Sequence, residues 1–280
     1  MQDSLRQNLQ RHLVEIVRDR DPFLATAGHF YVQRYIQQQL SQWGEVIPHE
    51  FSFNGRTHQN LILNLPAAQT TGKPPILIGA HYDTVPGSPG ADDNATGVAV
   101  LLELARVFAQ QPARHPIRCV AFDLEEMGVG NAAYVAELRQ KQEPLRLMLS
   151  LEMLGYCDRT PHSQHYPLDF FKLLYPNQGN YIALIGTPSI IPDLWRLSRT
   201  MRQSVPCEWL AVPNRGKLLP DSRRSDHAPF WDAGYRALMV TDTANLRNPH
   251  YHRQSDRLET LDLEFLTQVC YGLIEALHLL

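Results

Sequence analysis

Hydrophobic positions near the start of the chain recur with helical spacing. One periodic segment covers residues 5–18 and a second runs from about residue 27 to 43, so we expect two N-terminal helices within about 3–44. Residues then alternate between apolar and polar on both sides of Asn54-Gly55, a pair that favours a two-residue hairpin turn. The pattern therefore predicts a helical N-terminus followed by a β-hairpin.

From residue 74 onward, short segments that are apolar throughout alternate with amphipathic ones. PPILIGAHYD, IRCVAFDLEE and LRLMLSLEMLG are typical of strands, whereas TGVAVLLELARVFAQ and NAAYVAELRQ are typical of helices. A helix near 192–203, a strand in RALMVTDTA and a C-terminal helix from residue 261 complete the series. Strands that are apolar on both faces and joined by helices predict an α/β fold with a parallel sheet covered on both sides.

The pattern indicates one domain over residues 1–280. We find no internal repeat and no low-complexity segment. Residues 156–189 are rich in Pro, His and Tyr with weak periodicity, and we interpret them as a long loop excursion. A single α/β domain accommodates this length.

Composition narrows the class of protein. The formal net charge of −3 gives no reason to expect a nucleic acid or a membrane surface as partner. The N-terminus lacks the apolar core of a signal peptide and no run is long enough to span a bilayer, so we expect a cytoplasmic protein. Four widely spaced cysteines form no Cys-x-x-Cys pair and fit free thiols.

Chemically competent side chains follow the predicted strands at their carboxyl ends. They are His81 and Asp83, then Asp92 and Asp93, then Glu125 and Glu126, then Glu152, with His250 and His252 in a late loop. Ligands of open α/β sheets bind outside the carboxyl ends of the strands, so we expect these side chains to converge. Clustered carboxylates repel one another, and divalent cations relieve that repulsion. Imidazole with carboxylate suits Zn²⁺, and less strongly Mn²⁺ or Co²⁺.

Each of these groups taken alone has a simpler interpretation. His81 and Asp83 are consistent with a local hydrogen bond, Asp92-Asp93-Asn94 with a helix N-cap, and Glu125-Glu126 with a solvated strand end. Glu152 is harder to explain this way, because an unpaired carboxylate inside an apolar run is costly. All of these groups occur at the ends of successive predicted strands, and this shared position favours a metal site.

Six segments in this order resemble the M28 family of co-catalytic zinc peptidases, of the aminopeptidase Y and leucyl aminopeptidase type. They are GAHYDT, GADDNATGVAVLLELA, FDLEEMG, LEMLGY, SDHAPFWDAGYRALMVTDT and NPHYH, and the resemblance runs from about residue 60 to the C-terminus. It implies a three-layer α/β/α fold with a mixed, mostly parallel central sheet, as in glutaminyl cyclase. It also implies a cis peptide bond after Asp93.

The resemblance further implies a site for two zinc ions and a role for each residue. His81, Asp93 and Glu152 would bind one ion, and Asp93, Glu126 and His252 the other, with Glu152 standing where many relatives have Asp. A hydroxide bridging the ions would attack the first peptide bond of a peptide substrate, and Glu125 would act as general base and acid. Asp83 would orient His81, Asp226 would orient another group, and Tyr251 would donate a hydrogen bond to the oxyanion.

Several alternatives remain open on the sequence. A glutaminyl-peptide cyclotransferase shares the fold and uses one zinc ion, although relatives of that type have Trp at the position of Tyr251. Arg247, or the pair Arg223-Arg224, could hold a substrate carboxylate, which would favour a carboxypeptidase or dipeptidase. A non-catalytic scaffold is disfavoured because Glu125 and all five ligands are present, and an M20-type peptidase because no dimerisation insert is present. The residue preference and the oligomeric state are not predicted.

Overall fold

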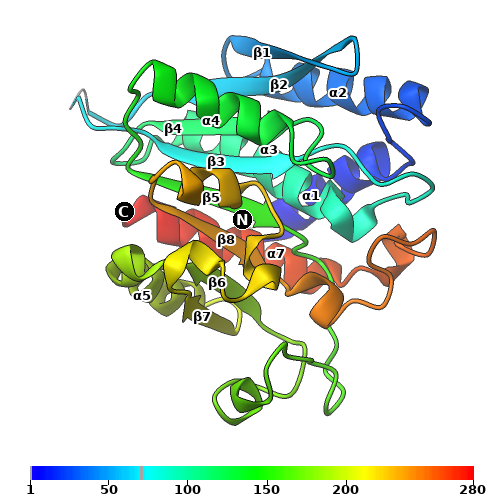
Figure 1. Ribbon diagram of the computed structural model, residues 1–280, viewed down its shortest axis with the longest axis vertical. Coiled ribbons are helices and arrows are strands. Elements are labelled where there is room, and N and C mark those ends of the chain that lie inside the picture. Colours follow the sequence, from blue (N-terminus) through cyan, green and yellow to red (C-terminus); the bar gives the residue numbers. More distant parts are fainter. Residues whose placement is uncertain (1, 70–71) are drawn as a thin grey trace.

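The computed structural model describes residues 2–69 and 72–280, and an eight-stranded sheet runs through its centre (Figure 1). Across the sheet the strands are β1 (Val46–Phe53), β2 (Arg56–Leu65), β4 (Ile117–Phe122), β3 (Ile76–His81), β5 (Leu147–Glu152), β8 (Ala237–Thr241), β6 (Ile182–Gly186) and β7 (Cys207–Ala211). Among the described residues, four of the seven strand pairings are parallel. The expected mixed, mostly parallel sheet is confirmed.

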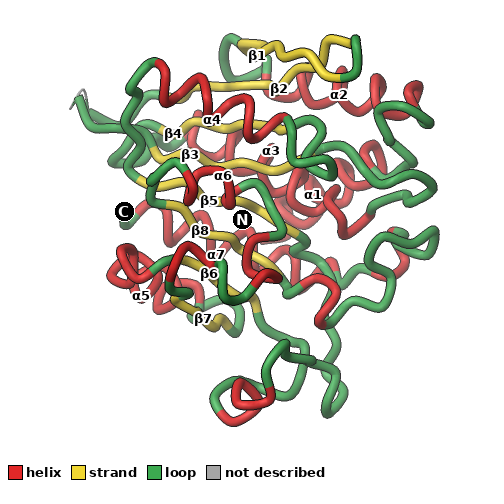
Figure 2. Tube along the Cα trace, in the orientation of Figure 1, coloured by secondary structure: helices red, strands yellow, loops and turns green. Residues whose placement is uncertain are grey.

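Helices cover both faces of this sheet (Figure 2). One face carries α1 (Gln2–Ile16), α2 (Thr26–Leu40), α3 (Gly97–Gln110), α5 (Ile191–Met201) and α7 (Leu263–His278), and the other carries α4 (Gly130–Gln140) and α6 (His227–Asp232). Successive side chains of a strand point to opposite faces, so Ile76 and Ile78 enter one core and Leu77 the other. This arrangement gives three layers, and the predicted fold class is confirmed.

Strand direction explains why the polar strand ends meet. β3 is parallel to both of its neighbours, with His81 beside Phe122 of β4 and Gly79 beside Ser150 of β5. β8 is parallel to β5, with Glu152 beside Thr241. The carboxyl ends of these four strands therefore open on one edge of the sheet, and the segments that follow them can build a single site.

The elements near the N-terminus agree with the sequence pattern, and those after β5 agree less well. Both N-terminal helices are present, and Asn54 and Gly55 form the hairpin turn with positive φ angles of 49° and 72°. The excursion expected over 156–189 is wrong at its end, because β6 lies inside that range. Its irregular part holds one 3-10 turn, Asp169–Leu173, and extends away from the sheet in Figure 1.

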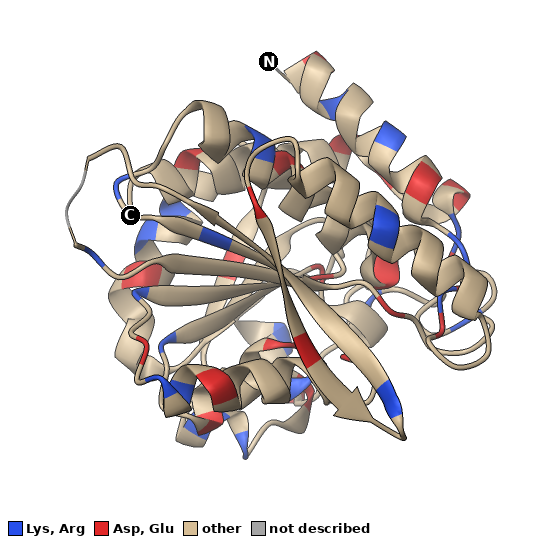
Figure 3. Ribbon diagram, turned by 90° about the horizontal axis from the view of Figure 1, so that it is seen from above, with Lys and Arg blue, Asp and Glu red and all other residues tan. Residues whose placement is uncertain are grey.

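Other whole-chain properties follow the composition. All four cysteines are free thiols, and three of them are buried. Over the described ranges, no helix is long and apolar enough to cross a lipid bilayer. Figure 3 shows acidic and basic positions interspersed along the outer helices, with the sheet between two helical layers.

Candidate active site

The end of β3 supplies the first part of the site. His81 is the last residue of the strand, and its Nδ1 atom lies 3.4 Å from Asp83 Oδ1 without forming a regular hydrogen bond. The carboxylate of Asp83 accepts hydrogen bonds from the backbone amides of Glu125 (3.1 Å) and Glu126 (3.2 Å). Asp83 thus connects the ends of β3 and β4 and fixes the turn that carries both glutamates.

Asp93 lies between the two candidate histidine ligands. Its Oδ1 atom is 3.3 Å from His81 Nε2, and its Oδ2 atom is 3.1 Å from His252 Nε2. A carboxylate with one oxygen toward each imidazole has the geometry that a bridging ligand requires.

The three glutamates lie around the side chains of His81, Asp93 and His252. Glu152 Oε2 is 3.6 Å from His81 Nε2, whereas Glu126 Oε2 is 3.2 Å from His252 Nε2. The carboxylate of Glu125 approaches His81 less closely, with Oε2 at 3.8 Å from Nε2. Three of these residues each offer one ligand atom, and the three atoms lie within 4.8 Å of one another: His81, Asp93 and Glu126. The five candidate ligands and Glu125 are therefore adjacent.

The segment 91–96, between β3 and α3, has an unusual backbone that holds Asp93 in place. The Asp93–Asn94 peptide bond is cis, as the resemblance predicts, although neither residue is proline. The side chain of Asn94 accepts hydrogen bonds from the amides of Gly97 (3.2 Å) and Met153 (3.1 Å). The ligand segment is thus joined both to the start of α3 and to the end of β5.

Of the cluster Asp92-Asp93-Asn94 that is consistent with a helix N-cap, Asn94 binds the first amide of α3 and Asp92 has other partners. Its carboxylate accepts hydrogen bonds from the amide of Gly155 (2.8 Å) and the side-chain amide of Asn248 (2.7 Å). The amide of Gly97 at the start of α3 is bound by Asn94 instead. Asp92 fastens the loops that follow β5 and β8 to the segment that carries Asp93.

Two polar partners of the site were not found from the sequence. The carboxylate of Asp256 accepts the backbone amides of Asp92 (2.9 Å) and Asp93 (3.1 Å). The hydroxyl of Ser225 donates to Glu152 Oε2 at 2.7 Å, and so fixes the carboxylate that faces His81. The adjacent Asp226, expected to orient a site group, accepts a hydrogen bond from Asn131 (3.0 Å) through Oδ1.

Electrostatics shows that the cluster carries more negative charge than its own side chains neutralise. Burial raises the pKa of Glu125, Glu126 and Glu152, and repulsion from Asp93 helps to bring that of Glu126 to about 7. Burial alone would lower the pKa of His252, but Asp93 and Glu126 outweigh it and raise the pKa to about 10. Left to themselves these groups bind protons, and a divalent cation would neutralise the same charge.

The residues present fit zinc. Ligands of a tetrahedral zinc ion, at bonds of about 2.0–2.1 Å, lie roughly 3.3–3.4 Å from one another. The four contacts of His81 and His252 with Asp93, Glu126 and Glu152 span 3.1–3.6 Å. Oε1 of Glu126 is buried and has no hydrogen-bond partner within the described part of the chain. Imidazole and carboxylate at these separations form a zinc-type donor set.

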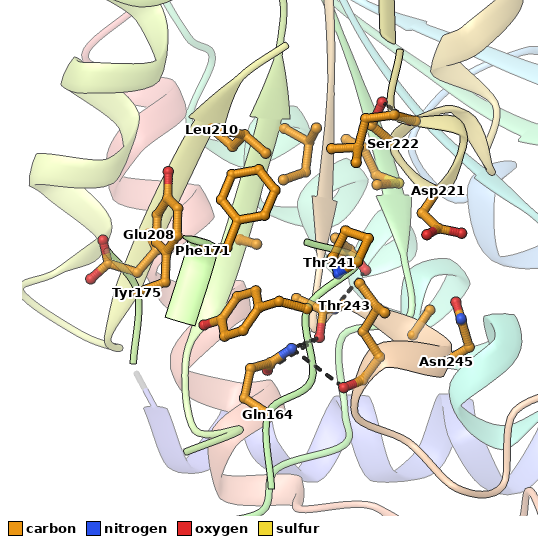
Figure 4. Close-up of a pocket in the computed structure, with 18 of the residues that line it drawn as sticks. Gln164, Phe171, Tyr175, Glu208, Leu210, Asp221, Ser222, Thr241, Thr243 and Asn245 are labelled. Carbon is orange, nitrogen blue, oxygen red and sulfur yellow. Dashed lines mark hydrogen bonds between the residues drawn. The ribbon is translucent and has the colours of Figure 1, made fainter. Parts of the chain in front are cut away.

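A cavity adjoins the cluster on the side of β6 and β7, with an empty volume of about 870 Å³ that is partly open to solvent. Glu152 and Tyr251 form its wall toward the cluster. Much of the remaining wall is apolar or aromatic and is contributed by the irregular part of 156–189 and by β6 and β7: Tyr166, Phe171, Tyr175, Tyr181, Ala183, Ile185, Trp209 and Leu210. Phe171, Tyr175, Glu208 and Leu210 lie on one side of the cavity in Figure 4, and Asp221 and Asn245 lie on the other.

The arginines considered for carboxylate binding separate into two groups. Arg247 is buried, with its Nε atom donating to Gln164 at 2.9 Å, and Arg223 pairs with Asp232 at 2.6 Å. Arg224 lines the cavity and donates to the hydroxyl of Tyr251 at 2.9 Å. Arg224 is therefore the member of the three that faces the candidate site.

Tyr251 and the other histidines complete the site. The ring of Tyr251 stacks on that of His252 with centroids 3.8 Å apart, so the tyrosine supports a candidate ligand directly. His227 is fully buried and bonds to the carbonyl of Ser222 at 2.8 Å, whereas His250 contacts Ser255 at 3.0 Å. These two histidines have structural partners outside the cluster.

An α/β sheet with this donor set at its edge defines the class, a metallohydrolase. The sequence profile of Peptidase family M28 matches residues 60–276, and the chain belongs to that family. The expected family, and with it the expected enzyme class of zinc-type metallopeptidases, is confirmed by this match and by the relatives described next.

Known relatives and structures agree on the family. The chain is 34% identical to the uncharacterized protein YfbL of Escherichia coli, with 85% of this chain and 76% of that protein covered. It is 30% identical to aminopeptidase YwaD of Bacillus subtilis over 82% of this chain but 46% of that protein. The chain thus spans about three quarters of one relative and less than half of the other.

Solved structures extend the comparison. A zinc aminopeptidase from Bacillus subtilis superposes with a TM-score of 0.60 at 26% identity, covering 80% of this chain and 50% of that one. A glutaminyl cyclase from Bacteroides thetaiotaomicron gives a TM-score of 0.69 at 16% identity, covering 99% and 97%, and shares the fold.

Proposed function

We propose that this chain is a di-zinc aminopeptidase that removes an N-terminal residue with a large apolar side chain. The observation that carries the proposal is the adjacency of three features: the cluster around Asp93, the carboxylate of Glu125, which is not a proposed ligand, and the aromatic cavity that begins at Glu152. His81, Asp93 and Glu152 would hold one ion, and Asp93, Glu126 and His252 the other. The relatives named as aminopeptidases support this assignment.

Each part of the site has its own role in the proposed reaction. Zinc, when bound, polarises a carbonyl oxygen and lowers the pKa of water. Glu125 takes a proton from the attacking water and returns it to the leaving amine, since burial raises its pKa toward the range of a general base. The cavity accepts the first side chain, and the Glu152 carboxylate at its rim faces the substrate ammonium. The hydroxyl of Tyr251 remains our candidate donor to the oxyanion.

The test combines zinc content with a substrate panel. We expect two zinc ions per chain by elemental analysis, and faster cleavage of leucyl and phenylalanyl anilides than of glycyl or glutamyl anilides. One zinc ion per chain with cyclisation of glutaminyl peptides would replace the proposal with a cyclotransferase. Cleavage from the carboxyl end, with Arg224 as the anchor for the terminal carboxylate, would replace it with a carboxypeptidase.

A variant tests the role of Glu125. Glu125→Gln keeps the shape of the side chain but cannot accept the proton, so kcat should fall about 10²–10⁴-fold. Zinc content should stay at the parent value, because this residue is not among the proposed ligands. A variant that retained parent kcat would move the base to another residue.

A further inference from the structure

A buried arginine lies directly behind the ligand segment. Arg20, in the connection between α1 and α2, is 0% exposed, and no carboxylate oxygen of the described residues lies within 4.0 Å of its guanidinium. Its donors bind backbone carbonyls instead: Nε binds Tyr82 (2.8 Å), Nη1 binds Pro89 (2.7 Å) and Arg18 (3.2 Å), and Nη2 binds Gly90 (2.9 Å). Burial of a cation costs free energy, so we expect the buried Arg20 to have a role that compensates for this cost.

Three of these four carbonyls lie at the two ends of one loop. Tyr82 follows the candidate ligand His81, and Gly90 precedes Asp93 by three residues, so one side chain grips both ends of the loop 82–90. The fit leaves no spare room, because a Cβ atom on Gly90 would lie 2.9 Å from Arg20 Nη1 and 2.3 Å from the carbonyl of Asp93. The backbone φ of +58° at this position also favours glycine.

Neighbours of Arg20 hold the same loop. The backbone amide of Arg20 donates to Thr84 Oγ1 at 3.1 Å, and Asp19 Oδ2 accepts the amide of Gly87 at 3.1 Å. His29, at the start of α2, lies 2.7 Å from Asp123, the residue before the turn that carries Glu125. One N-terminal segment therefore contacts the loops that follow both β3 and β4.

The charge of Arg20 acts on the cluster as well. Burial lowers its pKa to about 10, which leaves the guanidinium protonated at neutral pH. Asp93, Asp83 and Glu126 are close enough to favour this charged form, so the cation in turn reduces the repulsion among them. Phosphate or substrate cannot reach a side chain that is fully enclosed, so this positive charge serves the protein itself.

From these contacts we propose that residues 18–29, outside the family match, are part of the metal-binding apparatus, with Arg20 as the positioning residue for His81 and Asp93. The inference rests on the proposed zinc site. Partners of this kind change metal affinity about 10–100-fold when they are removed. Arg20 acts through the backbone of the loop and touches no substrate.

The experiment measures zinc affinity of the metal-stripped chain by competition with a chelating dye, and hydrogen exchange in peptides covering 82–96. Arg20→Met removes charge and donors, and Arg20→Lys keeps the charge but cannot reach three carbonyls. We expect both to bind zinc about 10–100-fold more weakly and to exchange faster in 82–96, with kcat reduced and KM within twofold. Asp19→Ala, which loses the Gly87 contact, should give a smaller change in the same direction.

A control separates positioning from general stability. Leu9→Ala creates a cavity under α1, far in sequence from the loop, and should lower stability while leaving zinc affinity within twofold of the parent. Parent zinc affinity in both Arg20 variants would overturn the inference, as would an equal loss in Leu9→Ala. If Arg20→Met does not fold, Arg20→Lys and Asp19→Ala decide. Zinc affinity and hydrogen exchange do not require peptide cleavage, so an inactive chain that loses zinc in these variants would overturn the proposed function alone.

Discussion

At the scale of single residues, the candidate ligands are held by neighbours that bind no metal. Ser225 is buried, donates to Glu152 Oε2 at 2.7 Å, and lies 2.6 Å from the hydroxyl of Ser150. This small network points one oxygen of Glu152 toward His81, and it leaves the carboxylate little freedom to rotate. Orientation of this kind sets ligand geometry as much as the ligand itself does.

Replacement of Ser225 by alanine should therefore affect zinc affinity more strongly than the stability of the fold. Ser225→Ala removes one hydrogen bond to a charged group, and zinc affinity should fall about tenfold. The free energy of unfolding of the metal-free chain should change by about 1–2 kcal/mol. Dye competition and urea unfolding measure the two effects. Ser198→Ala, a buried serine on α5, is the matched control and should keep parent zinc affinity; a loss there would contradict the assignment.

The sequence predicts the candidate ligands but not their supports, for a physical reason. His81 and Glu152 end their strands and Glu126 follows one closely. Parallel strands bring their carboxyl ends to one edge, so convergence could be inferred from spacing. Asp256 binds backbone amides more than 160 positions earlier in the chain. Arg20 likewise binds carbonyls, which every residue possesses. No side-chain pattern marks such partners, and only the folded backbone reveals them.

At the scale of elements, α5 is connected to the sheet by a buried carboxylate. Asp193, in the first turn of α5, accepts hydrogen bonds from Arg146 (2.7 Å) and Arg236 (2.5 Å), which lie just before β5 and β8. Burial alone would raise the pKa of Asp193, but the two arginines outweigh it and hold the pKa below its ordinary value. The carboxylate thus joins one helix to the entrances of two strands.

The pH dependence of stability should report this connection. A lowered native pKa stabilises the fold above the ordinary value near 3.8, and that contribution is lost as the pH falls through the native pKa. Asp193→Asn should therefore cost about 2 kcal/mol at pH 7, and the difference from the parent should narrow at pH 3. Urea midpoints of the metal-free chains measure it. Asp169→Asn, which breaks an exposed pair with Lys172, should leave the midpoint unchanged; a pH-independent difference for Asp193→Asn would contradict the argument.

At this scale, the clarity of the hydrophobic pattern decides which parts of the fold the sequence predicts. α1, α2, α3 and the hairpin are long or carry a strong turn signal, and each is found where periodicity indicates it. β6, β7 and α6 are five or six residues long, lie beside segments of weak periodicity, and are not predicted by the pattern. β3, β4, β5 and β8 are equally short, but they are apolar almost throughout and are predicted. β6 and β7 also line the cavity, so the wall of the proposed substrate pocket is harder to predict from the sequence than the candidate ligands are.

At the scale of the whole molecule, metal binding and folding should be coupled. An ion that binds the native state alone, at a concentration a thousandfold above its Kd, stabilises by about 4 kcal/mol. For a chain of this size that corresponds to a rise in Tm of roughly 8 °C. Chelation should lower Tm by about this amount, and added zinc should restore it, as measured by calorimetry. The variant His81→Ala, Asp93→Ala supplies the control, since the chelator should not shift its Tm; an equal shift there would indicate an effect unrelated to the site.

The N-terminal segment binds the loop 82–90, and this contact limits which hybrids between this chain and its relatives can keep the site intact. The family match begins at residue 60, yet Asp19, Arg20 and His29 lie before it and contact loops within it. A hybrid joined at residue 60, with its N-terminal part from a relative, would keep every candidate ligand. It would lose Arg20, which fits the loop 82–90 of this chain. The unit of exchange in evolution or engineering is therefore the matched region together with the helical segment that precedes it.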